Sequence, residues 1–201
     1  MIHTPVVRKN AEVLPYELTK ADIGRMAEAS RRLACDPLLI GRLCEKRPEW
    51  SAEAVRAIAL EGDFGFEEGG TILFGYCHGI KERWKDGEGE RRFRWACGAA
   101  HGKCWRQGLL SRSHHTVYMT EGETDAITVV SMGVEIPGET LVLALAAAQV
   151  YPSAPPFADK RIIVVPDLDE AGTRSAEELQ RRFRGIAKSI EFADLREVTS
   201  A

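Results

Sequence analysis

Two stretches decide the fold of this chain: TVYMTEGETDA at residues 116–126 and RIIVVPDLDEAG at residues 161–172. Each begins with a short apolar run of the kind that forms a buried strand. Each run then reaches acidic residues and continues into a pattern with helical spacing. In an open parallel sheet, ligands bind beyond the carboxyl ends of the strands. The two stretches therefore predict an acidic site shared by two neighbouring strands.

The same alternation continues on both sides of these stretches. Strands that alternate with helices favour parallel β-α units. We therefore predict an α/β domain over residues 115–201, with a mostly parallel sheet of roughly four strands and flanking helices. The expected strands are 116–120, 140–144, 161–165 and 187–192, and the expected helices are 124–132 and 172–183.

The first 62 residues predict a helical module, preceded by a loose arm over residues 1–15. Thr19 and Ser51 are typical helix caps, and Pro37 is typical of a first helical turn. The third helix should bury one face, formed by Ala54, Val55, Ile58 and Ala59. The first helix should have an apolar stripe formed by Ala21, Ile23, Met26, Ala27 and Leu33.

Residues 63–114 predict a small β-rich basic subdomain. Four glycines between 62 and 70 mark its boundary with the helical module,. Strand-like runs follow at 71–76, 80–84 and 91–95, with an Asp-Gly turn at 86–89. We therefore expect three consecutive parts, 1–62, 63–114 and 115–201.

Charge is distributed unevenly along the chain. The net charge is −3, but residues 81–112 carry nine basic and four acidic side chains. Residues 113–201 carry eight basic and 14 acidic side chains. A basic block beside an acidic block fits a polyanion that is guided towards a metal centre, although a solvated charged hairpin would have the same composition.

The composition also bears on the location of the protein. No apolar run approaches the roughly 18 residues that a membrane-spanning helix needs. The first residues lack the apolar core of a signal peptide, so we expect a cytoplasmic protein with no membrane partner. Five cysteines, an odd number, then argue for reduced thiols,.

The acidic residues suit a divalent cation. Glu121 follows its strand directly, and Asp167 and Asp169 follow theirs after one proline. Hard carboxylate oxygens of this kind suit Mg²⁺ or Mn²⁺. Glu121 is the candidate general acid or base, and Glu123 and Asp125 are secondary acidic candidates. Each carboxylate could instead stabilise the N-terminus of the helix that follows it.

These motifs resemble the Toprim domain of topoisomerases, primases, some nucleases and recombination mediators. The Glu-Gly-x-x-Asp-Ala form at residues 121–126 and the Asp-x-Asp-x-Ala-Gly form at residues 167–172 are most similar to the primase branch. The resemblance covers about residues 115–195. It implies a Rossmann-like fold in which Glu121, Asp167 and Asp169 are catalytic and bind Mg²⁺ or Mn²⁺. It also implies primer synthesis by nucleotidyl transfer, with single-stranded DNA and nucleotides as partners.

The β-rich segment is similar to the basic subdomain that phage and plasmid primases often place before Toprim. Its arginines, interleaved with tryptophans, could contact phosphates and stack on unpaired bases, or the tryptophans could pack in a core. Arg174, in the first turn of its helix, could bind phosphate or pair with Glu177 or Glu178. The candidate residues for binding nucleic acid or phosphate are Lys81, Arg83, Arg92, Arg94, Trp95, Arg106 and Arg174.

Zinc is not an expected cofactor. The chain has suitable zinc ligands but not the paired spacing of strong zinc sites. It also shows no zinc ribbon before the β-rich segment and no helicase-like phosphate loop, so a separate helicase or zinc-binding subunit is a candidate partner. The ligand types in question are Cys77, His78, Cys97, His101 and Cys104.

Three functions stay open at the level of the sequence. The first is a primase-like nucleotidyltransferase. The second is a Toprim nuclease, which would use the same metal with water as the nucleophile. The third is a non-catalytic module for DNA binding or assembly. All three share the fold and the acidic residues, so the sequence does not choose between them.

Overall fold

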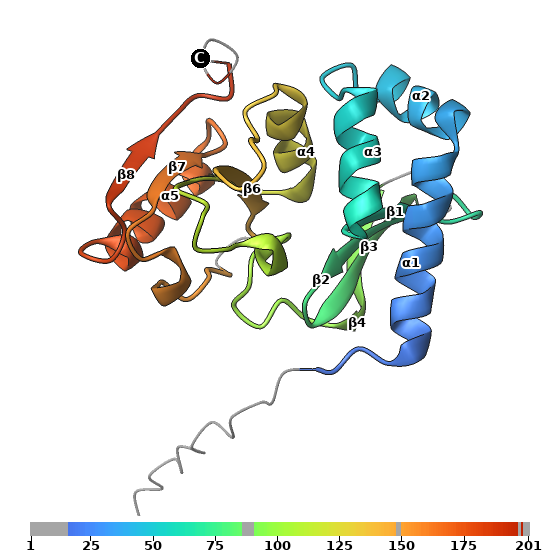
Figure 1. Cartoon of the computed structure of the whole chain (residues 1–201), viewed down its shortest axis with the longest axis horizontal. Helices are drawn as coiled ribbons and strands as arrows, with labels where there is room; N and C mark the ends of the chain where they lie inside the picture. The colour runs from blue at the N-terminus through green and yellow to red at the C-terminus, as the bar shows by residue number, and fades with distance from the viewer. Residues whose placement is uncertain (1–15, 86–90, 148–149, 197, 199–201) are drawn as a thin grey trace, which may run out of the picture.

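The computed structural model describes residues 16–85, 91–147, 150–196 and 198. The predicted arm at 1–15 and the predicted turn at 86–89 lie outside these residues. The described residues form two four-stranded sheets, one antiparallel and one parallel, with helices packed against them (Figure 1). Among these residues no helix combines the length and the apolar composition that crossing a membrane requires.

Three N-terminal helices begin where the sequence predicts. Each has a capping side chain that accepts a hydrogen bond from the first turn, which satisfies one of the free backbone N–H groups there. On the third helix the predicted apolar face is buried. The helices are α1 (Lys20–Cys35), α2 (Pro37–Lys46) and α3 (Ala52–Glu61), capped by Thr19, Asp36 and Ser51.

The buried face of α1 differs in part from the prediction. Met26 and Leu33 are buried as expected, but Ala21, Ile23 and Ala27 are exposed. Ile23 lies one turn before Met26 and borders a surface cavity. Ala21 and Ala27 lie off the buried stripe of α1. The residues of that stripe are Met26, Ala29, Ser30, Leu33 and Ala34.

The antiparallel sheet has the strand order β1-β2-β3-β4. Its first strand was missed in the glycine-rich boundary because it has only three residues. That strand lies directly on α1, and a Cβ atom at Gly65 would lie 2.8 Å from the Cβ of Ala29. The strands are β1 (Phe64–Phe66), β2 (Ile72–Tyr76), β3 (Gly79–Lys85) and β4 (Arg91–Gly98).

The parallel sheet has the order β6-β5-β7-β8, and all neighbouring strands in it are parallel. This confirms the predicted α/β architecture with a four-stranded parallel sheet and flanking helices. Its strands are β5 (Thr116–Thr120), β6 (Thr140–Ala144), β7 (Arg161–Val165) and β8 (Ser189–Phe192). Its helices are α4 (Glu123–Ser131) and α5 (Glu170–Phe183).

The two faces of the parallel sheet are covered by different helices. Successive side chains of a strand point to opposite faces. Val142 and Ala144 of β6 belong to the hydrophobic cluster that includes α4, whereas Leu141 and Leu143 belong to the cluster that includes α5. Hence α4 covers one face and α5 covers the other, and both helices begin at the edge where β5 and β7 end.

One hydrophobic cluster contains residues from all three predicted parts. It includes Ile58 of α3, Phe74 of β2, Trp105 of the connector and Ile127 of α4. Figure 1 shows α3 and α4 lying next to each other. The division at 1–62, 63–114 and 115–201 stays a prediction, and the packing makes these parts share a core.

Candidate metal and nucleic-acid site

The first acidic turn, residues 121–125, joins β5 to α4. Gly122 is the N-cap of α4 and makes no side-chain cap bond. The hydroxyl of Thr120 donates a hydrogen bond to the Gly122 carbonyl at 3.0 Å, which fixes the turn. Glu121 is half-buried at the carboxyl end of β5. Glu121 therefore lies at the end of the strand where the sequence places it.

The second acidic turn, residues 166–169, joins β7 to α5. Asp169 is the N-cap of α5 and accepts a hydrogen bond from the Gly172 backbone N–H at 2.7 Å. Its carboxylate thus performs the helix-capping role that was the alternative to metal binding. Asp167 is exposed. β7 is hydrogen-bonded to β5, and Thr120 is in register with Val165, so the two acidic turns start at the same level.

Glu121 and Asp167 meet in the structure. The backbone N–H of Asp167 donates a hydrogen bond to Oε1 of Glu121 at 3.2 Å, across a separation of 46 residues. Burial raises the pKa of Glu121, the hydrogen bond from the Asp167 backbone opposes this rise, and the negative charges of Asp167, Asp169 and Asp125 add to it,. The three aspartates therefore act electrostatically on Glu121, and the cation site stays a prediction.

Asp125 joins the same acidic environment from the first turn of α4. Burial raises its pKa to about 6, and the charge of Asp167 adds to the rise, whereas Arg47 opposes it. A Cβ atom at Gly122 would lie 3.0 Å from Oδ2 of Asp125. Within the described ranges, however, no three acidic, histidine or cysteine side chains are grouped so that they alone could hold a metal ion.

Glu123 points away from this environment. It is buried and accepts hydrogen bonds from the hydroxyl of Tyr76 on β2 and from Nζ of Lys81 on β3 at 2.8 Å. Burial and the neighbouring carboxylate raise the pKa of Tyr76, so its hydroxyl stays a donor. Lys81 also donates to the carbonyl of Ala146 at 2.8 Å. Glu123 and Lys81 therefore form an internal ion pair between the antiparallel sheet and the first acidic turn.

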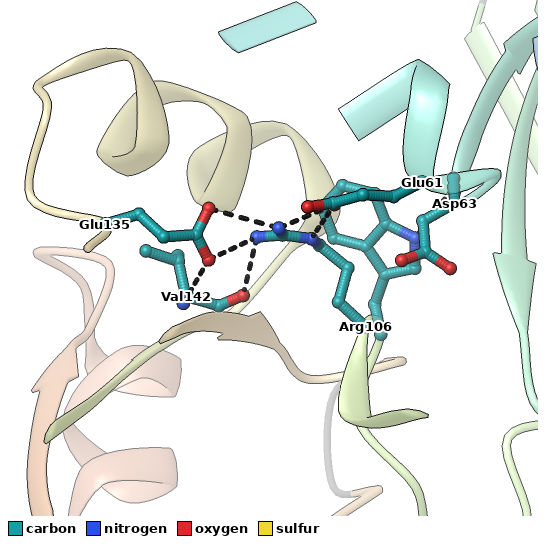
Figure 2. Close-up of polar contacts among 6 residues, drawn as sticks. Glu61, Asp63, Arg106, Glu135 and Val142 are labelled. Carbon is teal, nitrogen blue, oxygen red and sulfur yellow. Dashed lines mark hydrogen bonds and ion pairs between the residues drawn. The ribbon is translucent and has the colours of Figure 1, made fainter. Parts of the chain in front are cut away.

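Arg106 is also engaged inside the molecule. It is buried, with a left-handed backbone at φ 62°, and its guanidinium donates to Glu61 of α3, to Glu135 and to the carbonyl of Val142 (Figure 2). Burial alone would lower the pKa of Arg106, but the two glutamates raise it overall. The Arg106 side chain therefore joins α3 to β6 inside the molecule instead of facing solvent.

Three further basic candidates lie on the antiparallel sheet. Arg83 lies over the ring of Phe93, with 5.0 Å from Cζ to the ring centroid. Arg94 pairs with Glu82 and lies over the indole of Trp84 at 4.6 Å. Arg92 is exposed on β4.

Trp95 and Arg174 have structural contacts of their own. The half-buried Trp95 packs edge-on against the ring of Tyr76, with centroids 5.0 Å apart. Arg174 pairs at 2.9 Å with Glu170, one helical turn before it, rather than with Glu177 or Glu178. Trp95 thus packs inside the molecule, as one of its two alternatives predicts, whereas Arg174 pairs with a glutamate that was not among its expected partners.

Two residues near the acidic turns were not singled out from the sequence. The indole N–H of Trp50 donates to the carbonyl of Thr124 at 3.3 Å and to the hydroxyl of Thr128 at 3.2 Å. The guanidinium of Arg47 lies over the Trp50 ring at 5.1 Å. No local pattern predicts this, because Trp50 and Thr124 are 74 residues apart.

The cysteines form no disulfide bonds in the described part of the chain. Cys104 is buried, and burial raises its pKa, whereas Cys35 and Cys77 are exposed. The rings of His78 and His101 lie 5.9 Å apart, edge to face.

Comparison with models of known protein families and with curated proteins gives no match to this chain. Among solved structures, the chain is similar to the zinc-binding and RNA polymerase domains of the primase from Aquifex aeolicus, with a TM-score of 0.44 and 12% sequence identity. The matched region covers 90% of this chain and 58% of the primase chain. The chain therefore corresponds to little more than half the length of that structure.

Proposed function

We propose that this chain is a Toprim-type, primase-like protein that transfers nucleotidyl groups on single-stranded DNA with Mg²⁺ or Mn²⁺. The observation that carries the proposal is the contact between Glu121 and the backbone of Asp167 at 3.2 Å. It brings the two motifs that resemble Toprim sequences into contact, which supports one shared site. That site lies at the carboxyl ends of adjacent parallel strands, where open α/β sheets bind their ligands.

The donor set fits a small hard cation. Mg²⁺ usually keeps several waters and takes one or two protein carboxylates together with substrate phosphates. Glu121 and Asp167 would hold the ion in this proposal, and Asp169 lies next to them as the N-cap of α5. A bound ion would supply positive charge beside the transferred phosphoryl group.

The antiparallel sheet would supply the surface for the DNA strand. Arg92 and Arg94 of β4 are exposed, and Arg83 of β3 lies beside them over Phe93. Positive charge on such a sheet attracts phosphates without reading sequence. The Glu123–Lys81 ion pair connects this sheet to the turn that carries Glu121.

The test is primer synthesis from ribonucleotides on single-stranded templates of varied sequence, with Mg²⁺ or Mn²⁺. We expect the wild type to make primers and Glu121→Gln to lose on the order of 100-fold or more of the rate, because a catalytic carboxylate is removed. Glu177→Gln, which changes an exposed carboxylate of α5, is the matched control and should keep the rate.

Two arms of the same experiment separate the alternatives. Cleavage of plasmid or single-stranded DNA in the absence of nucleotides indicates nuclease activity. DNA binding that survives Asp167→Asn, with neither synthesis nor cleavage by the wild type, indicates a non-catalytic module. Either result, without primer synthesis, contradicts the proposed function.

A further inference from the structure

A cavity next to the acidic turns has a chemistry that the site described above does not use. Its volume is about 440 Å³, which is within the range of small-ligand sites,. It lies between the end of α2, the residues after β1 and the strand β3. The charged and aromatic side chains that line it are Lys46, Arg47, Trp50, Phe66, Arg83 and Trp84.

All charged side chains of this cavity are cationic. Lys46, Arg47 and Arg83 line it, and no carboxylate stands among its lining residues in the described part of the chain, although Arg47 also pairs at 2.5 Å with Glu49 outside the lining. Three other surface cavities mix both signs, such as the one that contains Arg25 and Glu67. In a chain of net charge −3, this concentration of positive charge in a concave surface selects for an anion,.

The cavity also offers flat surfaces. Trp84 is half-buried, and Arg94 lies over its indole at 4.6 Å. Arg47 lies over the ring of the buried Trp50 at 5.1 Å. Indole and guanidinium planes are the groups on which unpaired bases stack in proteins that bind nucleotides or single strands. An anion that also carries an aromatic ring therefore fits this cavity better than a simple phosphate.

One lining residue of the cavity, Trp50, also contacts the first acidic turn. Trp50 donates to the carbonyl of Thr124, the residue before Asp125. The charge of Arg47 acts on Asp125 as well. A ligand held in the cavity would therefore have Asp125 and the first acidic turn as near neighbours.

We propose that this cavity binds a nucleotide, with its base against Trp84 and its phosphate on Lys46, Arg47 and Arg83. The proposal rests on the proposed function only for the fate of that nucleotide, because binding in the cavity needs neither the metal nor turnover. The nucleotide is either a free nucleoside triphosphate or a unit of a single strand, since both present the same base and phosphate.

The experiment measures binding to the full chain in EDTA, where no turnover occurs, by tryptophan fluorescence and calorimetry. The probes are ATP, an oligo-dT strand of about 12 nucleotides and an abasic strand of the same length. We expect Trp84→Leu to weaken the binding of the probes that carry bases by about 5- to 100-fold, which is the range for loss of one stacked base. The binding of the abasic strand should not change. Phe192→Leu, which changes an exposed aromatic residue on β8, should change neither.

A second variant keeps the test decisive if Trp84→Leu does not fold. Lys46 is exposed, so Lys46→Gln should keep the melting temperature of the wild type. It should weaken the binding of every phosphate-bearing probe several-fold. The control Lys188→Gln, also at an exposed lysine, should leave the binding unchanged. Tight ATP binding identifies a free nucleotide as the ligand, and tight oligo-dT binding identifies a strand.

Wild-type binding of all probes by a folded Trp84→Leu or by Lys46→Gln overturns the proposal, as does an abasic strand that binds as tightly as oligo-dT. These outcomes are distinct from failure of the proposed function. A protein that binds nucleotide in the cavity but makes no primers refutes the function alone. A protein that makes primers but binds as the wild type after both substitutions refutes the cavity alone.

Discussion

Gly172 lies between the two acidic turns, in the first turn of α5. A Cβ atom at this position would lie 2.1 Å from the carbonyl oxygen of Asp167 and 2.7 Å from Oε1 of Glu121. The glycine is needed here for space rather than for an unusual φ angle. The contact that joins the two turns therefore depends on the absence of a side chain.

Gly172→Ala should lower the free energy of unfolding by about 1–3 kcal/mol, the usual cost of adding a methyl group to a filled site. Gly24→Ala is the control, because Gly24 lies in α1 with open space around it. It should be neutral or stabilising by up to about 1 kcal/mol, since alanine favours helix more than glycine does. Urea unfolding of the two variants measures the difference, and equal effects would contradict the crowding at Gly172.

Asp63 is a second residue whose surroundings set its chemistry. Burial raises the pKa of its carboxyl to about 7, with a further rise from Glu61 and Glu135 that Arg106 opposes. The side chain lies close to the Arg106 cluster, as Figure 2 shows.

The folded state holds the Asp63 proton more tightly than the unfolded state does. Unfolding free energy should therefore fall as pH rises from about 4 to about 7, by at most about 4 kcal/mol, since one pKa unit corresponds to about 1.4 kcal/mol. Asp63→Asn should remove most of this slope and make the protein more stable than the wild type at pH 8. Urea unfolding at pH 5 and pH 8 tests this, and an unchanged slope in Asp63→Asn would show that another group is responsible.

At the scale of elements, the ion pair of Lys81 with Glu123 connects β3 to the start of α4. Both side chains are largely buried, with 14% and 4% of their surfaces exposed. Loss of one partner leaves the other charge buried and unpaired, which is costly even where the intact pair contributes little net stability. The pair therefore fixes how the antiparallel sheet meets the first acidic turn.

Lys81→Met should destabilise the protein by about 3–5 kcal/mol, and the double variant Lys81→Met, Glu123→Gln should lose clearly less than the sum of the two single variants. The exposed pair Arg174–Glu170 is the matched control, with a coupling energy of about 0.5 kcal/mol or less,. Thermal and urea unfolding of both cycles gives these values. Additive effects for the buried pair would mean that the two side chains do not depend on each other.

The elements differ in how far local sequence predicts them. The strands at 116–120, 140–144 and 161–165 were predicted with the bounds that the structure has, because short apolar runs between turn residues leave few alternatives,. β1 was missed because Gly65 is a weak strand former whose placement depends on close contact with α1,.

The candidate site divides in the same way. Strand order, glycine placement and the resemblance to Toprim sequences together predict that Glu121 and Asp167 meet, and the structure shows their contact. The internal roles of Lys81 and Arg106 could not, because their partners Glu123 and Glu61 lie 42 and 45 residues away in the chain. A basic residue in a basic block carries no local sign of whether it faces solvent or a buried carboxylate.

At the scale of the whole molecule, the two sheets are held together by α3, α4 and the Arg106 cluster. The hydrophobic cluster around Trp105 crosses the boundaries that composition suggests. Both sheets therefore contribute to one folding unit, and the acidic turns depend on contacts from the first half of the chain.

Mg²⁺ should stabilise the whole protein, because an ion that binds only the folded state shifts unfolding by mass action. At about 100 times its dissociation constant it should add about 2.7 kcal/mol relative to EDTA. The gain should be lost in Asp167→Asn and kept in Glu177→Gln. Differential scanning calorimetry at constant ionic strength measures it, and equal gains in the two variants would place the ion elsewhere.

The backbone of Trp105 has a further consequence for how copies of this protein behave towards one another. β6 is the edge strand of the parallel sheet, and Trp105 donates its N–H to the carbonyl of Ala144 at 2.8 Å in an antiparallel bridge. Ile136 forms a second bridge, to Thr140 at the opposite end of β6. An unprotected edge strand is a template for intermolecular pairing and aggregation. Both ends of β6 are thus closed to a neighbouring chain, and among the described residues the four-residue strand β8 is the other edge of this sheet, with no further strand paired to it.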